Sequence, residues 1–287
     1  MKIVGVQMDV TLGDVQSNLK RIDECSGKAK ELGARLVVFP ECAITGYCFN
    51  SKEEALPYST PVPGEHVDAL VKIAAKHDLH IVAGSLESSG NELFNVALCV
   101  SPAGLSACYR KTHLPHLGVD HFTSPGGADW NPKDADSRDP YPVFEVDGVR
   151  VGVLICYDAS FPEASRILTL KGADLIVLPT NWPPGAEPTA DYVINARASE
   201  NKVYYISVNR IGHERGFDFI GKSKICDVHG NTLEFADHQK EQMLSAEIDE
   251  REARDKRIQR TAGHWVDRLA DRRPELYGRV CETPRST

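Results

Sequence analysis

Hydrophobic runs divide the chain into short strands and amphipathic helices that alternate over most of its length. Apolar positions with a period near 3.6 predict helices, and short β-branched runs predict strands. The predicted strands cover residues 2–8, 35–39, 80–85, 95–100, 106–110, 143–146, 149–155, 173–178, 203–209, 222–227 and 243–248. The predicted helices cover residues 14–34, 65–77, 162–171 and 191–201. This alternation indicates an α/β protein.

A similar sequence pattern of eleven residues occurs twice in the chain. Glu31-Leu-Gly-Ala-Arg-Leu-Val-Val-Phe-Pro-Glu41 aligns with Leu170-Lys-Gly-Ala-Asp-Leu-Ile-Val-Leu-Pro-Thr180. Each segment reads as the end of a helix, a glycine, a strand, a proline and a polar residue. The match indicates two similarly built halves whose strand ends face a shared site, although convergent helix-to-strand loops also produce it. Glu41 then ends one of these strands.

Three residues with reactive side chains follow strand-like segments: Glu41, Lys111 and Cys156. Ligand sites in open α/β sheets lie beyond the carboxyl ends of strands. A cysteine nucleophile needs a base or a positive charge nearby. A carboxylate shielded from water serves as a base near neutral pH, and a lysine stabilises a developing oxyanion. The residues alone leave two alternatives open: a cysteine that only fills the core, and a Glu–Lys ion pair without chemistry.

Length, charge and cysteine usage narrow the class of protein. The 287 residues allow one large domain or two ordinary ones. A net charge of −8 without a large basic block makes nucleic acid an unexpected partner. No apolar run approaches the roughly 18 residues of a membrane span, and the chain starts with a strand-like segment instead of a signal peptide. Eight cysteines in a chain of this length fit free thiols. We therefore expect a cytoplasmic protein that does not bind membranes.

Residues 111–141 lack regular periodicity, and a loop of this length is usually functional or disordered. It contains His113, His116 and His121, whose spacing matches no standard zinc pattern, so we expect no metal site. A second motif, residues 216–223, matches the P-loop pattern for phosphate binding. That pattern requires a following helix, whereas residues 224–230 read as a strand and a turn. A nucleotide-binding protein is therefore the disfavoured alternative.

Three segments, taken together, resemble the signature segments of the nitrilase, or carbon–nitrogen hydrolase, superfamily. They are Pro40-Glu41, Tyr109-Arg-Lys111-Thr-His-Leu-Pro115, and Leu154-Ile-Cys156-Tyr-Asp158 with Phe161-Pro-Glu163 downstream. They occur in family order, and the resemblance runs from residue 1 to about residue 248. It implies a four-layer α-β-β-α sandwich that forms the catalytic domain over residues 1–250. Residues 251–287 then form a charged extension that packs on this domain or on an oligomer partner. Family members commonly form homodimers or larger homo-oligomers.

The resemblance also implies a reaction. Glu41 is the general base, Lys111 stabilises the oxyanion, Cys156 is the nucleophile, and the backbone N–H of Tyr157 is a second oxyanion donor. The expected activity is hydrolysis of a non-peptide C–N bond in a small amide. It proceeds through a cysteine thioester, releases ammonia or an amine, and requires no metal or organic cofactor. A catalytically silent scaffold is a further alternative, which the intact Glu41, Lys111 and Cys156 disfavour.

The chain departs from the family pattern at two places that bear on its subclass. Many relatives carry a second glutamate shortly after the lysine, and here only Asp120 is available to support Glu41. Carbamoyl-amino-acid hydrolases often place an arginine just after the Asp of the cysteine segment, where this chain has Ala159-Ser160. We therefore favour an amide substrate over an N-carbamoyl compound, which stays as the alternative. Asn181 and Trp182 are expected to line the substrate pocket.

Overall fold

The first of two large β-sheets is built mainly from the N-terminal part of the chain. The structure is a computed structural model that describes residues 1–131, 133, 138–237 and 239–282. Six strands pair in the order β14-β1-β2-β3-β4-β5. They are β1 (Lys2–Gln7), β2 (Leu36–Val38), β3 (His80–Ser89), β4 (Glu92–Ser101), β5 (Gly104–Arg110) and β14 (Gln242–Glu247). Strand β14 comes from far along the chain and pairs antiparallel with β1, so it closes the edge of this sheet.

The second sheet has the same number of strands, paired in the order β13-β12-β9-β8-β7-β6. They are β6 (Val143–Val146), β7 (Val149–Val153), β8 (Leu175–Thr180), β9 (Tyr204–Asn209), β12 (Lys224–Cys226) and β13 (Thr232–Phe235). Strands β7, β8 and β9 run parallel, whereas β6 and β12 join them antiparallel. The central strands are buried along their length, as the continuous apolar runs predict.

The repeated order of residue types corresponds to equivalent positions in the two sheets. Strand β2 lies between parallel β1 and β3, and β8 lies between parallel β7 and β9. Each triplet is connected through helices: α1 (Val15–Glu31) and α3 (Glu65–His77) in the first, α4 (Pro162–Leu170) and α5 (Ile194–Asn201) in the second. Glu41 is the last residue of the first matched segment, just beyond β2, and Asn181 directly follows the second matched segment, at the end of β8. Two similar βαβαβ halves therefore supply the strand ends that carry Glu41 and Asn181.

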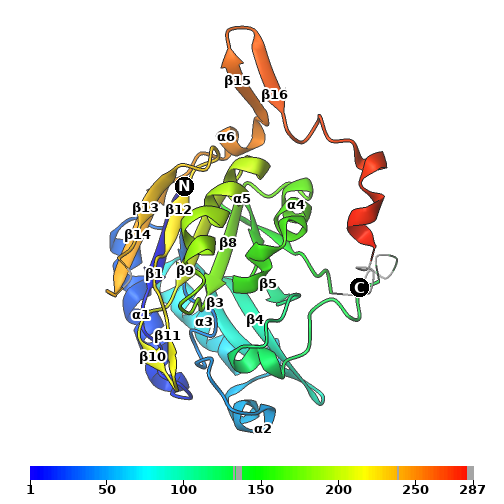
Figure 1. The fold of residues 1–287 in the computed structure, drawn as a ribbon. Helices are drawn as coiled ribbons and strands as arrows, with labels where there is room; N and C mark the ends of the chain where they lie inside the picture. The colour runs from blue at the N-terminus through cyan, green and yellow to red at the C-terminus, as the bar shows by residue number, and fades with distance from the viewer. Residues whose placement is uncertain (132, 134–137, 238, 283–287) are drawn as a thin grey trace.

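The helices cover the outer faces of the two sheets, which pack against each other through an apolar interior (Figure 1). The sheets approach closely at Gly5, where an added Cβ would lie 3.0 Å from both Ile206 Cδ1 and Val208 Cγ2 of the opposite sheet. Side chains in protein interiors are already close-packed, so a larger residue at this position would push the sheets apart. The predicted four-layer α-β-β-α sandwich is thus confirmed.

Some predicted boundaries differ from those observed. The strand that leads to Cys156 ends at Val153, and Cys156 itself begins a short 3₁₀ helix, Cys156–Ser160. The helix predicted at 191–201 starts with a π-helical turn, Thr189–Val193. The first residues of the P-loop-like motif, which covers residues 216–223, belong to a hairpin. This hairpin is formed by β10 (His213–Glu214) and β11 (Phe217–Asp218). Strand β12, not a helix, follows that motif, and the phosphate-binding geometry is therefore missing.

The charged C-terminal segment contains more regular structure than its sequence predicted. Helix α6 (Glu250–Arg254) is followed by the hairpin of β15 (Arg257–Thr261) and β16 (His264–Asp267). This hairpin projects from the sandwich, and the chain then runs past α4 towards its end (Figure 1). Two 3₁₀ turns, Pro274–Leu276 and Gly278–Cys281, complete the segment. Residues 283–287 of the predicted extension lie outside the described residues.

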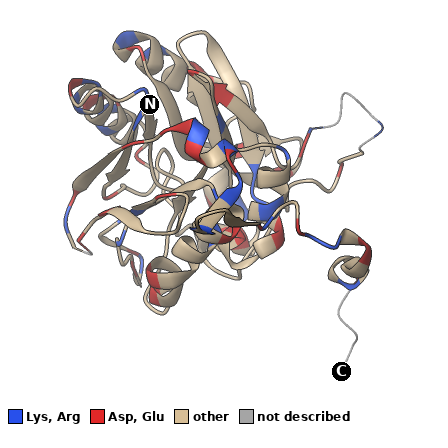
Figure 2. Ribbon diagram, turned by 90° about the horizontal axis from the view of Figure 1, so that it is seen from above, with Lys and Arg blue, Asp and Glu red and all other residues tan. Residues whose placement is uncertain are grey.

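Charges of both signs are interspersed over the elements of the molecule (Figure 2). Many form ion pairs at the surface, such as Arg35 with Asp78 and Asp147. Pairs of this kind contribute little individually, because water screens them. Among the described residues, no helix is long and apolar enough to cross a membrane.

Candidate active site

Glu41 lies just beyond β2, in a segment that continues beside β3. The N–H of Gly84 donates to Pro40 O, and the N–H of Ile44 donates to Gly84 O. Gly84 permits this contact because an added Cβ there would lie only 2.1 Å from Cys42 N and 2.6 Å from Glu41 Cα. The segment therefore crosses β3 at a position that only glycine allows, and this crossing holds Glu41 in the interior, where its side chain is fully buried.

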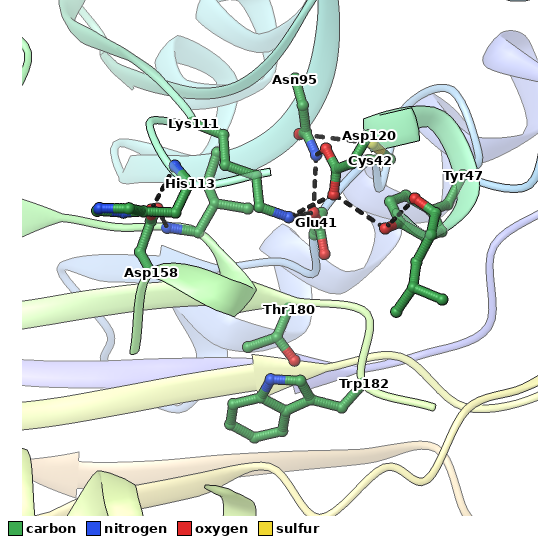
Figure 3. Close-up of polar contacts among 12 residues, drawn as sticks. Glu41, Cys42, Tyr47, Asn95, Lys111, His113, Asp120, Asp158, Thr180 and Trp182 are labelled. Atoms are coloured by element: carbon green, nitrogen blue, oxygen red, sulfur yellow. Dashed lines mark hydrogen bonds and ion pairs between the residues drawn. The ribbon is translucent and has the colours of Figure 1, made fainter. Parts of the chain in front are cut away.

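Lys111 follows β5, and its Nζ lies between two buried carboxylates (Figure 3). It donates to Glu41 Oε1 at 2.7 Å and to Asp120 Oδ2 at 2.5 Å. All three side chains are buried. An ammonium group has three N–H donors, so one donor is left without an acceptor among the residues that the structure describes.

Asn95, on β4, completes this group, and the sequence did not single it out. Its Nδ2 donates to Glu41 Oε1 at 2.7 Å and to Asp120 Oδ1 at 2.8 Å, so Asn95 and Lys111 bridge the same two carboxylates (Figure 3). Its Oδ1 lies 3.6 Å from Cys42 Sγ. Glu41 Oε1 therefore receives two hydrogen bonds, whereas Glu41 Oε2 has no partner among the described residues. The only signal in the sequence is a polar residue within the buried strand Phe94-Asn-Val-Ala-Leu98.

Asp120 lies in the 3₁₀ turn Gly118–His121, within the long loop that lacked periodicity. The hydroxyl of Tyr47 lies 2.9 Å from Asp120 Oδ2 and 2.8 Å from the carbonyl oxygen of Leu117. Tyr47 was also missed by the sequence reasoning, because nothing distinguishes it from an ordinary core aromatic residue. Asp120 contacts Lys111 and Asn95 directly and reaches Glu41 only through them.

Cys156 is held at a sharp turn on the other sheet. Its φ of +48° lies in the left-handed region, which non-glycine residues rarely adopt. Such strain persists only where the surroundings impose it, and it is concentrated at functional sites. The backbone N–H of Asn181, just beyond the neighbouring strand β8, lowers the pKa of the Cys156 thiol, against the raising effect of burial. Cys156 and Asn181 thus follow two adjacent strand ends.

The turn that carries Cys156 is fastened to the loop that carries Lys111 by Asp158. This buried carboxylate accepts hydrogen bonds from Ile155 N at 2.9 Å and Tyr109 Oη at 2.7 Å. It also accepts from His113 N at 3.1 Å, and it lies 2.7 Å from His113 Nδ1. Asp158 therefore joins the two sheets beside the reactive groups.

The electrostatic environment of the site favours the neutral form of the Cys156 thiol and the charged form of Lys111. Burial raises the pKa of the Cys156 thiol well above its ordinary value, and the Glu41 carboxylate raises it further. Burial also raises the pKa of Glu41, against the lowering effect of the Lys111 charge. For Lys111, burial acts to lower the pKa, but the Asp120 and Glu41 carboxylates outweigh it and raise the pKa well above its ordinary value. The thiol must therefore lose its proton to a base during the reaction.

The remaining predicted pocket residues, Asn181, Trp182 and Tyr157, differ in how deeply they are buried. Asn181 and Trp182 are buried at the end of β8, whereas the Tyr157 ring is partly exposed and packs edge-on against Phe161. Trp182 N donates to Asn209 Oδ1 at 2.8 Å.

The three loop histidines do not converge on one point. His113 contacts Asp158 and stacks on Phe161, with ring centroids 3.8 Å apart. His116 and His121 form a separate exposed pair, with their Nδ1 atoms 3.3 Å apart. Within the described residues, no group of three or more His, Cys, Asp or Glu side chains is arranged to hold a metal ion.

Comparison with known proteins defines the class. The carbon-nitrogen hydrolase family model matches residues 3–257, and the chain therefore belongs to this family. It is 37% identical over 280 residues to a nitrilase of Pyrococcus abyssi, covering 97% of this chain and 100% of that protein. It is 31% identical over 290 residues to an (R)-stereoselective amidase of a Pseudomonas species, covering 99% of this chain and 96% of the amidase.

Solved structures extend the likeness to three dimensions. NitN amidase from Nesterenkonia sp. AN1 superposes with a TM-score of 0.78 at 26% identity, covering 96% of this chain and 98% of the amidase. A mutant of that amidase, at 25% identity and a TM-score of 0.76, shows the acetamide moiety of fluoroacetamide covalently added at the active site cysteine; the match covers 96% of this chain and 95% of the mutant. The present chain is a carbon-nitrogen hydrolase with the same sandwich fold.

Proposed function

We propose that the protein hydrolyses the C–N bond of small amides through a thioester on Cys156. The observation that carries this proposal is the buried group of Glu41, Lys111, Asp120 and Asn95, which leaves two functional atoms unused. One is Glu41 Oε2, a proton acceptor, and the other is the third N–H of Lys111, an oxyanion donor. The nucleophile is Cys156, which has a strained backbone and whose thiol pKa is raised by the Glu41 charge and lowered by the Lys111 charge.

The proposed reaction begins with transfer of the thiol proton from Cys156 to Glu41 Oε2. The sulphur then attacks the carbonyl carbon, and the oxyanion is held by Lys111 and the backbone N–H of Tyr157. Protonated Glu41 gives its proton to the leaving nitrogen as the C–N bond breaks, which releases ammonia or an amine and leaves the acyl group on sulphur. Glu41 then takes a proton from water, and the resulting hydroxide attacks the thioester carbonyl. The C–S bond breaks to release the carboxylic acid, and Glu41 returns its proton to the Cys156 sulphur. Every step uses side chains of this chain, with Asp120 and Asn95 as positioning residues.

N-carbamoyl compounds and nitriles are the alternative substrates. One relative, at 37% identity, is named a nitrilase and another, at 31% identity, an amidase, so the family alone does not decide between nitriles and amides. The residues after Asp158 are Ala159 and Ser160, which provide no cation for a substrate carboxylate. Arg166, farther along α4, donates instead to Glu200 O at 3.0 Å. We therefore place amides first.

A substrate panel tests the proposal. Primary amides, N-carbamoyl compounds and nitriles are scored by ammonia release with the wild type, Cys156→Ala and the matched control Cys281→Ala, whose exposed thiol lies in the C-terminal segment. We expect ammonia from amides with the wild type and the control, and a loss of at least about a thousandfold for Cys156→Ala. Full activity of Cys156→Ala would disprove the cysteine mechanism, and activity on nitriles alone would disprove the choice of amides.

The C-terminal segment supports a further proposal on assembly. The β15–β16 hairpin forms a sheet of only two strands, and such a hairpin is marginally stable by itself. Trp265 is 58% exposed on it, and Leu276 in the following turn is 67% exposed. Contiguous apolar patches mark interaction surfaces, and a hairpin that projects from the sandwich with an exposed tryptophan is a candidate to contribute to one. We propose that residues 251–287 extend the catalytic domain of residues 1–250 and pack against a second copy of the chain.

A cytoplasmic location is also proposed, since all eight cysteines are free thiols.

A further inference from the structure

The side chain of Asn181 is a buried amide for which the fold provides no use. It is 2% exposed, and neither its Nδ2 nor its Oδ1 has a hydrogen-bond partner among the described residues. Most buried polar side chains are hydrogen-bonded, because an unpaired one forfeits its contacts with water. An amide that is unpaired on both its donor and its acceptor side therefore calls for a ligand with both kinds of group.

The position of Asn181 places this amide beside the nucleophile. Strands β7 and β8 are parallel neighbours, and Leu154 N donates to Val177 O at 3.0 Å, so Cys156 and Asn181 follow adjacent strand ends. The backbone amide of Asn181 also lowers the pKa of the Cys156 thiol, and the side-chain amide is only three bonds away from that nitrogen. The amide group therefore lies within the reach of one small residue from the reacting atom. Glu41 Oε2, on the opposite sheet, is another buried polar atom without a hydrogen-bond partner among the described residues.

The backbone around Asn181 is held in place by Asn209 on β9. Thr180 Oγ1 and Trp182 N both donate to Asn209 Oδ1, at 2.9 and 2.8 Å. Asn209 Nδ2 in turn donates to Gly221 O at 2.7 Å. The residues on both sides of Asn181 are thus fixed, which limits the positions that its buried side chain can reach.

We propose that the Asn181 amide binds a hydroxyl group on the carbon next to the scissile carbonyl, and so makes the enzyme selective for 2-hydroxy amides. This inference rests on the proposed amide hydrolysis. A hydroxyl offers one donor and one acceptor, which match Oδ1 and Nδ2. Glu41 and Lys111 are already committed to the leaving nitrogen and the oxyanion, which leaves the acyl side of the substrate for Asn181. We place the hydroxyl on the carbon next to the scissile carbonyl because the Asn181 side-chain amide lies close to the Cys156 sulphur, which attacks that carbonyl.

The test compares lactamide with propionamide, which differ by this one hydroxyl. Ammonia release gives kcat/KM for both substrates with the wild type, with Asn181→Leu, which keeps the side-chain shape but removes both polar groups, and with Asn91→Leu as the control. Asn91 is exposed in the turn between β3 and β4. We expect the wild type and the control to prefer lactamide. In Asn181→Leu the preference should fall at least about tenfold, mainly through lactamide.

The possible outcomes separate this inference from the function on which it rests. If the wild type releases ammonia from neither these two nor any other amide of the panel, the proposed function fails. If the wild type hydrolyses propionamide as well as lactamide, only the role of Asn181 is refuted, whatever the variant does. An equal loss on both substrates would also refute it, because Asn181 would then act on the carboxamide that both share. Asn181→Ala, which cannot overfill the site, replaces the leucine variant if that variant does not fold.

Discussion

At the scale of single residues, the site depends on the different hydrogen bonding of the two carboxylate oxygens of Glu41. Lys111 and Asn95 both donate to Oε1, and Oε2 stays unpaired. The reactive residues Glu41, Lys111 and Cys156 were predicted from the sequence because each follows a strand-like segment. Asn95 was not, because a polar residue inside a buried strand looks the same whether it serves a site or a core. The sequence thus predicts the reactive groups better than the residues that orient them.

Removal of the Asn95 donors should shift the acid limb of the pH profile upwards. The hydrogen bond from Asn95 stabilises the charged form of Glu41 and lowers its pKa, so Asn95→Leu should raise that pKa. The base form is then lost at a higher pH as the solution is acidified. We expect the acid limb of kcat/KM to move to higher pH, with a fall in kcat/KM of roughly tenfold to a hundredfold. An unshifted limb in this variant would indicate that Asn95 is only structural.

Neutralising Asp120 should shift the same limb in the opposite direction. The negative charge of Asp120 raises the pKa of Glu41, and Asp120→Asn removes it while keeping the side-chain shape. The Glu41 pKa should therefore fall, and the base form should persist to lower pH. The pH dependence of kcat/KM measures this shift beside that of Asn95→Leu. Shifts of the same sign in both variants would contradict the role of Glu41 as the base.

At the scale of elements, the strand ends converge because two similar βαβαβ units pack face to face. The sequence predicted the central strands and long helices, since their periodicity is strong and their interiors are apolar. It did not predict the hairpins β10–β11 and β15–β16 or the edge strand β13. Strand β13, Thr232-Leu-Glu-Phe235, is exposed along its length, and its polar and apolar residues alternate over only four positions, the shortest run that indicates a strand. Elements without a buried face leave little trace in a single sequence.

The crossing at Gly84 gives an element-scale prediction. A methyl group there would overlap Cys42 N and the Glu41 backbone, so Gly84→Ala must move the segment that carries the base. We expect a loss of about 1–3 kcal/mol in the free energy of unfolding and a fall in kcat/KM of about a hundredfold or more. Denaturant unfolding and ammonia release measure the two effects. The control is Gly278→Ala, because no heavy atom lies within 4 Å of the added Cβ. Wild-type activity in Gly84→Ala would show that the Glu41 segment is not held in this way.

At the scale of the whole molecule, the C-terminal segment is the part that the sandwich does not enclose. If the β15–β16 hairpin packs on a second copy, replacement of its exposed tryptophan should weaken the assembly. Trp265→Ser is expected to shift the molecule towards the monomer at micromolar concentration, measured by sedimentation velocity. Trp130→Ser is the matched control, since Trp130 is also exposed but lies in the loop after β5. A wild type that is already monomeric would exclude the proposed assembly.

The close approach of the sheets at Gly5 has a consequence for how activity varies among related sequences. The proposed base Glu41 and Lys111 belong to one sheet and the proposed nucleophile Cys156 to the other, so the thickness of the apolar interior sets the distance over which the proposed proton transfer occurs. Gly5, Ile206 and Val208 act as a spacer in this interior, although none of them is polar. Drift in the size of such spacer residues therefore retunes the catalyst without altering any reactive group, and inspection of the reactive residues alone would not reveal it.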